Sequence, residues 1–139
     1  MKKIIVLILI MLSPHIGLWA QKGWSVQVAF DEFSVKKNAT EVVMSGKRLK
    51  DFHLNYFHSL EIKNPSVSDR QRITSLVKAD AAQAITQEEN SGHRFYELPN
   101  KSQRAYILYR DNGSTLTLIY IEGKANLKQI KQYFQKKQK

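Results

Sequence analysis

Apolar and polar residues alternate in two segments in the first half of the chain, and a short β-branched segment lies between them. Residues 24–30 place Trp24, Val26, Val28 and Phe30 on one side and Ser25, Gln27 and Ala29 on the other. A period of two is typical of a strand with one buried face. Residues 40–44 form a short stretch with β-branched side chains. In residues 54–62 apolar and polar positions alternate again. The pattern therefore predicts three strands, with residues 47–51 as an exposed basic connection.

The predicted strand over residues 54–62 carries a histidine on its apolar side. Leu54, Tyr56, Leu60 and Ile62 share that side with His58. Asn64-Pro65-Ser66 then ends the strand, and the apolar spacing changes to that of a helix. The helical positions are Ile73, Leu76, Val77, Ala81, Ala84 and Ile85. Ser66 or Ser68 can cap this helix and Asn90-Ser91-Gly92 can end it, so we expect one long central helix.

Asn112-Gly113 predicts a hairpin in the second half of the chain, because this pair tolerates the positive φ angles of a tight turn. The flanking strands are residues 105–110 and 115–121. A two-residue turn would place Tyr109 opposite Leu116 and Ile107 opposite Leu118, which makes one face wholly apolar. That face should meet the helices. Residues 93–98 predict a further strand before the hairpin.

Asn126 can cap a final helix with Leu127, Ile130, Tyr133 and Phe134 inward. The predicted fold class is α+β, with a mostly antiparallel sheet of five to six strands, one long central helix and a C-terminal helix, in the order ββ(β)αβββα. The chain holds no cysteine, so stability must come from packing without disulfides. Residues 21–139 are long enough for one such core and too short for two domains.

Residues 1–20 have the anatomy of a cleavable secretory signal. Lys2 and Lys3 precede an apolar run over residues 4–12, and Ser13-Pro14 interrupts it before Ala20. A membrane anchor is the weaker alternative, because a spanning helix needs ~20 apolar residues. We therefore expect an exported protein, periplasmic or extracellular, cut near Ala20. No transmembrane span is expected after the signal is removed.

The chain is strongly basic with or without this signal. It has 22 Lys and Arg against 12 Asp and Glu. The signal holds two lysines and no acid, so residues 21–139 keep 20 against 12, a net charge of +8. Such a balance favours solubility and attracts anionic partners. Export makes nucleic acid an unlikely partner and favours an envelope protein, an acidic glycan or an anionic lipid surface.

Three stretches together resemble a known group of proteins. They are Ala20-Gln21 after the signal, Ser45-Gly46-Lys47-Arg48-Leu49 leading to Phe57-His58-Ser59-Leu60, and residues 118–125 before the final helix. In these stretches the chain resembles small exported Bacteroidota proteins of unknown function. The resemblance implies a periplasmic or secreted α+β domain and carries over no catalytic residue.

Motifs for catalysis, metals and cofactors are missing from the sequence. It has no nucleophile elbow, metalloprotease motif, Walker loop or dinucleotide fingerprint. His53 and His58 are five residues apart, which places them on opposite faces of a strand. His58 is expected to be a core histidine with bonded ring nitrogens. The alternative function is a small hydrolase that uses His58 with a nearby acid and a serine.

The most suggestive basic residues lie in two segments. The candidate anion or partner surface consists of Lys47, Arg48, Lys50, Lys124, Lys128 and Lys131. The final helix could lie in a membrane interface or pack on the sheet with a basic tail. Packing is favoured, because the hairpin needs a cover. The sequence thus predicts a non-enzymatic binding or accessory module of the cell envelope, with no cofactor.

Overall fold

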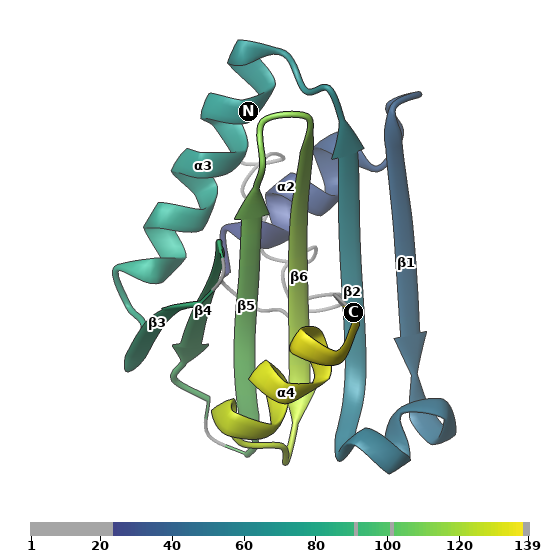
Figure 1. The fold of residues 1–139 in the computed structure, drawn as a ribbon, viewed down its shortest axis with the longest axis vertical. Helices are drawn as coiled ribbons and strands as arrows, with labels where there is room; N and C mark the ends of the chain where they lie inside the picture. Colours follow the sequence, from purple (N-terminus) through teal and green to yellow (C-terminus); the bar gives the residue numbers. More distant parts are fainter. Residues whose placement is uncertain (1–23, 91, 101, 138–139) are drawn as a thin grey trace, which may run out of the picture.

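A computed structural model describes residues 24–90, 92–100 and 102–137 (Figure 1). It contains one six-stranded antiparallel sheet in the order β1-β2-β6-β5-β4-β3, with helices on both faces. The strands are β1 (Ala39–Ser45), β2 (Leu54–Lys63), β3 (Thr86–Asn90), β4 (His93–Leu98), β5 (Arg104–Asp111) and β6 (Thr115–Gly123). The helices are α2 (Val26–Phe33), the 3₁₀ helix η2 (Gly46–Phe52), α3 (Val67–Ala81) and α4 (Leu127–Lys137). The predicted α+β class is confirmed.

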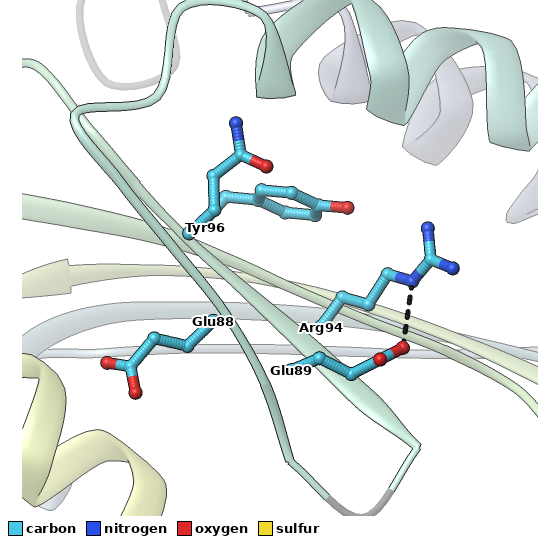
Figure 2. Close-up of a pocket in the computed structure, with 5 residues that line it drawn as sticks. Glu88, Glu89, Arg94 and Tyr96 are labelled. Carbon is cyan, nitrogen blue, oxygen red and sulfur yellow. Dashed lines mark hydrogen bonds and ion pairs between the residues drawn. The ribbon is translucent and has the colours of Figure 1, made fainter.

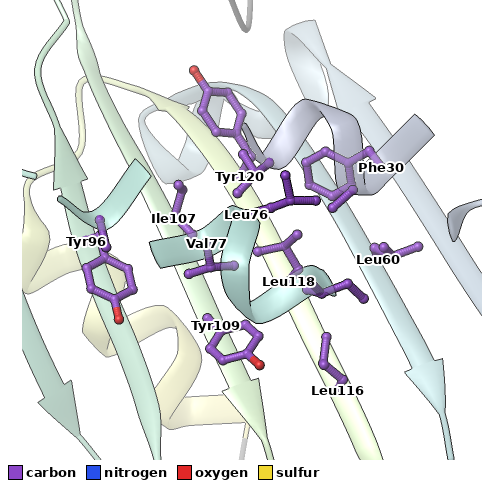
Figure 3. Packing of buried hydrophobic residues seen from close by; sticks show 14 of the residues in the cluster. Phe30, Leu60, Leu76, Val77, Tyr96, Ile107, Tyr109, Leu116, Leu118 and Tyr120 are labelled. Atoms are coloured by element: carbon purple, nitrogen blue, oxygen red, sulfur yellow. The ribbon is translucent and has the colours of Figure 1, made fainter. Parts of the chain in front are cut away.

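The larger core lies between the sheet and the pair α2 and α3. Figure 3 shows Leu76 and Val77 of α3 and Phe30 of α2 packed among side chains of the sheet. The sheet contributes Leu60, Ile62, Tyr96, Leu98, Ala105, Ile107, Tyr109, Leu116, Leu118 and Tyr120. The predicted apolar face of the hairpin therefore does meet helices, and these helices are α2 and α3.

The helix α4 covers one end of the opposite face of the sheet (Figure 1). Leu127 and Ile130 of this helix are buried among Phe95, Tyr106, Leu108, Ile119 and Ile121. Asn126 caps the helix, because its Oδ1 accepts a hydrogen bond from the backbone N–H of Gln129 at 2.9 Å. The final helix thus packs on the sheet as predicted, but it does not cover the predicted apolar face of the hairpin: it lies on the other face, over Tyr106, Leu108, Ile119 and Ile121.

The predicted first strand is wrong, because residues 26–33 form the helix α2. The same residues satisfy both periods: Val26, Ala29, Phe30 and Phe33 are spaced as one helical face, and all four are buried. The Asp80 carboxylate favours the helix over the strand. It accepts hydrogen bonds from the backbone N–H groups of Ser25 and Val26 at 2.7 and 2.8 Å, which caps the first turn of the helix.

The strand β3 is missing from the predicted order, since its sequence is polar and has no apolar alternation. It is held by pairing with β4, starting from the bond of the Ile85 N–H to the Glu97 carbonyl at 2.8 Å. The helix α3 ends at Ala81, so Ala84 and Ile85 lie outside it. The order is therefore αββαββββα.

The hairpin register differs from the predicted one by two residues. Tyr109 pairs with Leu118 and Ile107 with Tyr120, since the connection is longer than two residues. The Asn112 Oδ1 accepts hydrogen bonds from the N–H groups of Ser114 and Thr115 at 3.1 and 2.8 Å, which stabilises the longer turn. A shift of two leaves each side chain on its predicted face.

Candidate functional site

An apolar pocket lies between η2, the end of the sheet and α4. Its volume is about 390 Å³. The lining residues are Met44, Leu49, Asp51, Phe52, Leu54, Phe57, Ile121, Tyr133 and Phe134, and we call this cavity the α4 pocket. Asp51 is the one residue of this lining with a charged side chain. Pockets that hold small molecules are typically apolar with few polar groups and measure ~300–1,000 Å³.

A β-bulge in β2 gives the pocket part of its wall. The pairing of β2 with β6 shifts between Leu54 and Tyr56, so Leu54 turns to the α4 face while Tyr56 stays on the opposite one. The prediction that both share one face is therefore wrong. Gly123 pairs with Leu54, and a Cβ atom on Gly123 would lie 2.5 Å from the Leu54 Cα. Only glycine permits this close approach.

Two contacts between α4 and η2 close one side of the pocket. The Tyr133 hydroxyl donates a hydrogen bond to the Phe52 carbonyl at 2.9 Å. The rings of these two residues meet edge to face, with centroids 5.3 Å apart. Because the Tyr133 hydroxyl is already bonded within the chain, the pocket offers a bound group mainly apolar and aromatic surface.

Part of the predicted anion surface lies on a segment that lines this pocket. Lys47, Arg48 and Lys50 belong to η2, which also supplies Leu49, Asp51 and Phe52 to the lining, and all three cations are exposed. Lys124 is joined to the end of η2, because its N–H donates to the His53 carbonyl at 2.8 Å. Four residues of the predicted set thus lie on η2 or in the segment bonded to its end.

The two lysines on α4 have different surroundings. Lys131 forms an ion pair with Glu88 of β3 at 2.7 Å, which ties the helix to the opposite edge of the sheet. Lys128 is exposed near the start of the same helix, in the turn after Asn126. The predicted set is therefore divided between the η2 side and the β3 side of α4.

His58 is enclosed by the sheet and α2. It is 6% exposed, and its ring stacks on Phe30 with centroids 3.8 Å apart. Its Nε2 lies 2.6 Å from a Glu41 carboxylate oxygen, and its Nδ1 lies 3.3 Å from the Tyr56 hydroxyl. The carboxylate required by the hydrolase alternative is present, but neither of these partners is a serine, and the ring is covered. This geometry does not support a hydrolase.

A second hollow, at the β3–β4 edge, is polar and open. Figure 2 shows its side chains, and about 300 Å³ lies between Gln87, Glu88, Glu89, Arg94 and Tyr96. Arg94 pairs with Glu89 at 3.4 Å, while Glu88 points away from both, toward Lys131. Neighbouring carboxylates that diverge in this way do not form a catalytic pair.

In the part of the chain that the structure describes, none of the helices has the length and apolarity needed to cross a membrane. Residues 24–90, 92–100 and 102–137 also hold no group of three or more histidine or carboxylate side chains placed to bind a metal ion. The α4 pocket is therefore the best candidate site in this part of the chain.

The sequence contains little signal for the α4 pocket. Leu49 and Asp51 lie in residues 47–51, the segment predicted as an exposed connection, but Leu49 is buried and both line the pocket. Leu54 is predicted on the opposite face of its strand. The predicted inward positions Tyr133 and Phe134 do line the pocket. A hint exists in the pair Leu49 and Phe52, whose spacing of three residues suits a helical turn with one apolar side.

Comparison with known proteins agrees with a chain of uncharacterised function. Neither the curated proteins nor the solved structures contain a match to it. Residues 14–134 match a family of unknown function, DUF6108. This match spans every helix and strand from α2 to β6 and most of α4. The chain belongs to the DUF6108 family.

Proposed function

We propose that this protein is an exported, non-enzymatic binding module of the cell envelope whose ligand is a single-chain anionic amphiphile. The alkyl chain would enter the α4 pocket, and the acidic headgroup would lie over Lys47, Arg48 and Lys50. One observation carries the proposal: an apolar cavity of about 390 Å³ has its wall built by the segment that bears three exposed cations.

The pocket lining favours an alkyl chain over a sugar. Burial of apolar surface contributes ~25 cal/mol per Å², whereas a hydroxyl buried without a partner costs free energy. An acidic glycan would bring many hydroxyl groups to a lining with one exposed carboxylate and a tyrosine hydroxyl bonded to the Phe52 carbonyl. The volume is at the lower end for small-molecule sites, which suits one chain rather than two.

The charges beside the pocket favour an anion. Three cations and one acid, Asp51, lie within the seven residues of η2. Exposed ion pairs contribute ~0.5 kcal/mol each. Three such pairs with a headgroup would give ~1.5 kcal/mol, or about tenfold in affinity. The alkyl chain would therefore supply most of the affinity. The cations would make the site bind a negatively charged headgroup more tightly than a positively charged one.

Calorimetric titration with decanoate, below its micelle concentration, tests this proposal. We expect saturable binding to the protein from residue 21 onward, which contains every described residue. Along the series hexanoate, octanoate and decanoate, each methylene that enters the pocket should contribute ~0.8 kcal/mol, about fourfold in affinity. Acetate should not bind, and decyltrimethylammonium, with the same chain and a positive headgroup, should bind at least about tenfold more weakly than decanoate.

In the same titration, variants separate the contribution of the cations to decanoate affinity from that of the apolar pocket. Changing Lys47, Arg48 and Lys50 to glutamine should weaken decanoate binding about tenfold, while Asp51→Asn should strengthen it. The matched control changes three exposed lysines elsewhere, Lys37, Lys63 and Lys78, and should leave the affinity unchanged. Equal losses in the two triple variants, or no chain-length dependence, would contradict the proposed site.

Export is tested separately, through the N-terminus of the protein recovered from a bacterial host. We expect the chain to be found outside the cytoplasm and to begin at or close to Gln21, since residues 1–20 carry the predicted signal. A variant with Ile8→Asp, which interrupts the apolar run, should stay uncleaved in the cytoplasm. Recovery of the unaltered chain in the cytoplasm with Met1 or Lys2 at its start would exclude export.

A further inference from the structure

The strand β1 forms one edge of the sheet and has few of the features that normally protect an edge, since Glu41 is its one charged residue. Within residues 24–90, 92–100 and 102–137 it pairs with β2 alone. Its register with β2 runs without a bulge from Ala39 to Ser45. Neither lysine nor proline occurs in it. Val42 and Val43, at its centre, are 42% and 53% exposed on opposite faces. An edge of this kind can accept another strand.

The opposite edge is protected in several ways. The strand β3 is five residues long and contains two glutamates. Glu88 is paired with Lys131 of α4, and Glu89 with Arg94 of β4. Short length and charge both discourage the addition of a strand. The strand β1 is therefore the edge of this sheet that is less protected against the addition of a strand.

The backbone of β1 presents regularly spaced groups for a new strand. The Lys63 N–H donates to the Asn38 carbonyl at 3.0 Å, so the even-numbered residues of β1 direct their backbone groups at β2. In an antiparallel pair this direction alternates along the strand. The N–H and carbonyl groups of Glu41 and Val43 therefore point away from the sheet.

The side chain of Glu41 does not oppose an incoming acidic strand strongly, because its carboxylate is held 2.6 Å from the His58 Nε2 on the sheet surface. Cations lie at both ends of β1. Lys36 and Lys37 precede the strand, and Lys47 and Arg48 follow it. Lys36 is paired with Asp69 at 3.1 Å, and Lys37, Lys47 and Arg48 are exposed.

This distribution of charge also bears on self-association. A second copy paired antiparallel about Val42 would bring the cations before one β1, Lys36 and Lys37, toward the cations after the other, Lys47 and Arg48. Like charges brought together in this way are unfavourable. An incoming strand with acidic ends would instead form an ion pair at each end.

We propose that β1 is a docking edge for an extended segment of a partner protein that is β-branched at its centre and acidic at both ends. The main-chain hydrogen bonds would supply affinity, as in other complexes formed by strand addition. The valines would pack with the centre of the segment, and the flanking cations would select its ends. This edge shares Lys47 and Arg48 with the segment that lines the α4 pocket, whereas the outward backbone groups of Glu41 and Val43 belong to the edge alone.

A labelled nine-residue peptide, Asp-Glu-Val-Thr-Val-Thr-Val-Glu-Asp with blocked termini, tests the proposal by fluorescence anisotropy. Val43→Pro removes an N–H that points away from the sheet, a position where an edge strand tolerates proline. We expect it to weaken peptide binding about tenfold or more with unchanged circular dichroism. A peptide of the same centre with lysine ends should bind more weakly, and Lys37→Glu should weaken the acidic peptide.

The matched control is Lys78→Glu, an exposed charge reversal on α3 that should have no effect. Val43→Pro should leave decanoate binding unchanged, since Val43 does not line the α4 pocket, which separates this result from the function of the pocket. The proposal is overturned if the acidic peptide does not bind, or binds equally well to Val43→Pro. A dimer in sedimentation experiments that Val43→Pro dissociates would assign the edge to a second copy instead.

Discussion

Gly123→Ala is expected to lower the free energy of unfolding by about 3 kcal/mol, toward the upper end of what overpacking costs. The added Cβ would lie 2.5 Å from the Leu54 Cα and 2.6 Å from the His53 carbonyl oxygen. Both are backbone atoms, so no side chain can turn aside to make room. The strand β2 must move at its bulge, which would also displace Leu54 from the wall of the α4 pocket. Urea unfolding followed by circular dichroism measures the loss.

Gly113→Ala is the matched control, because Gly113 is required by its backbone conformation and not by a close approach of other atoms. A Cβ atom on Gly113 would meet nothing within 4 Å, but its φ is 95°. The substitution would therefore cause only backbone strain. We expect it to lower the free energy of unfolding by ~1–2 kcal/mol and to leave decanoate binding unchanged. If Gly123→Ala were as stable as the unchanged protein, the close packing of β6 on the bulge would be wrong.

Asp80→Ala is also expected to lower the free energy of unfolding by about 3 kcal/mol, because two hydrogen bonds to a charged group are lost. The side chain is fully buried, and its two oxygens accept from the N–H groups of Ser25 and Val26. Without it the first turn of α2 has unbonded donors beside the larger core. Asp31→Ala, which removes an exposed carboxylate bonded to Gln27, should cost less than ~0.5 kcal/mol. Equal unfolding midpoints for the two variants would contradict the capping role.

The same carboxylate should give stability a specific dependence on pH. Burial raises the pKa of Asp80 above its ordinary value of 3.8, against the opposing effect of its backbone hydrogen bonds. The folded state then binds the proton more tightly than the unfolded state. The contribution is fully present below pH 3.8 and is lost as the pH rises through the raised pKa. The stability of the unchanged protein relative to Asp80→Asn should therefore fall as pH rises from about 3.8, and a rise would contradict this sign.

Much of the sheet could be predicted from the sequence, but by different local signals. Residues 54–62 alternate because β2 has one buried side. Residues 40–44 are rich in β-branched side chains although β1 is largely exposed, and Asn112-Gly113 marks a hairpin whose strands are buried on both sides. The central helix is predicted equally well, since Ile73, Leu76 and Val77 lie on one side of it. In these elements the local pattern and the tertiary packing agree.

The predictions failed where a distant contact decides the local structure. Residues 26–33 are compatible with two periods, and Asp80, more than fifty residues away, selects the helix. The strand β3 has no apolar pattern and exists through its hydrogen bonds to β4. The α4 pocket depends on a bulge at Leu54 and on the room left by Gly123. A single sequence contains no signal for the bulge or for the close approach at Gly123.

The most direct test of the central claim is to locate bound decanoate by the chemical shifts of methyl groups. The side chains of Leu49, Leu54 and Ile121 line the α4 pocket, whereas Ile73, Val77 and Leu118 lie in the core on the opposite face of the sheet. Our account predicts saturable shifts in the first group and nearly none in the second. Shifts concentrated in the second group, or none in either at saturating decanoate, would contradict it.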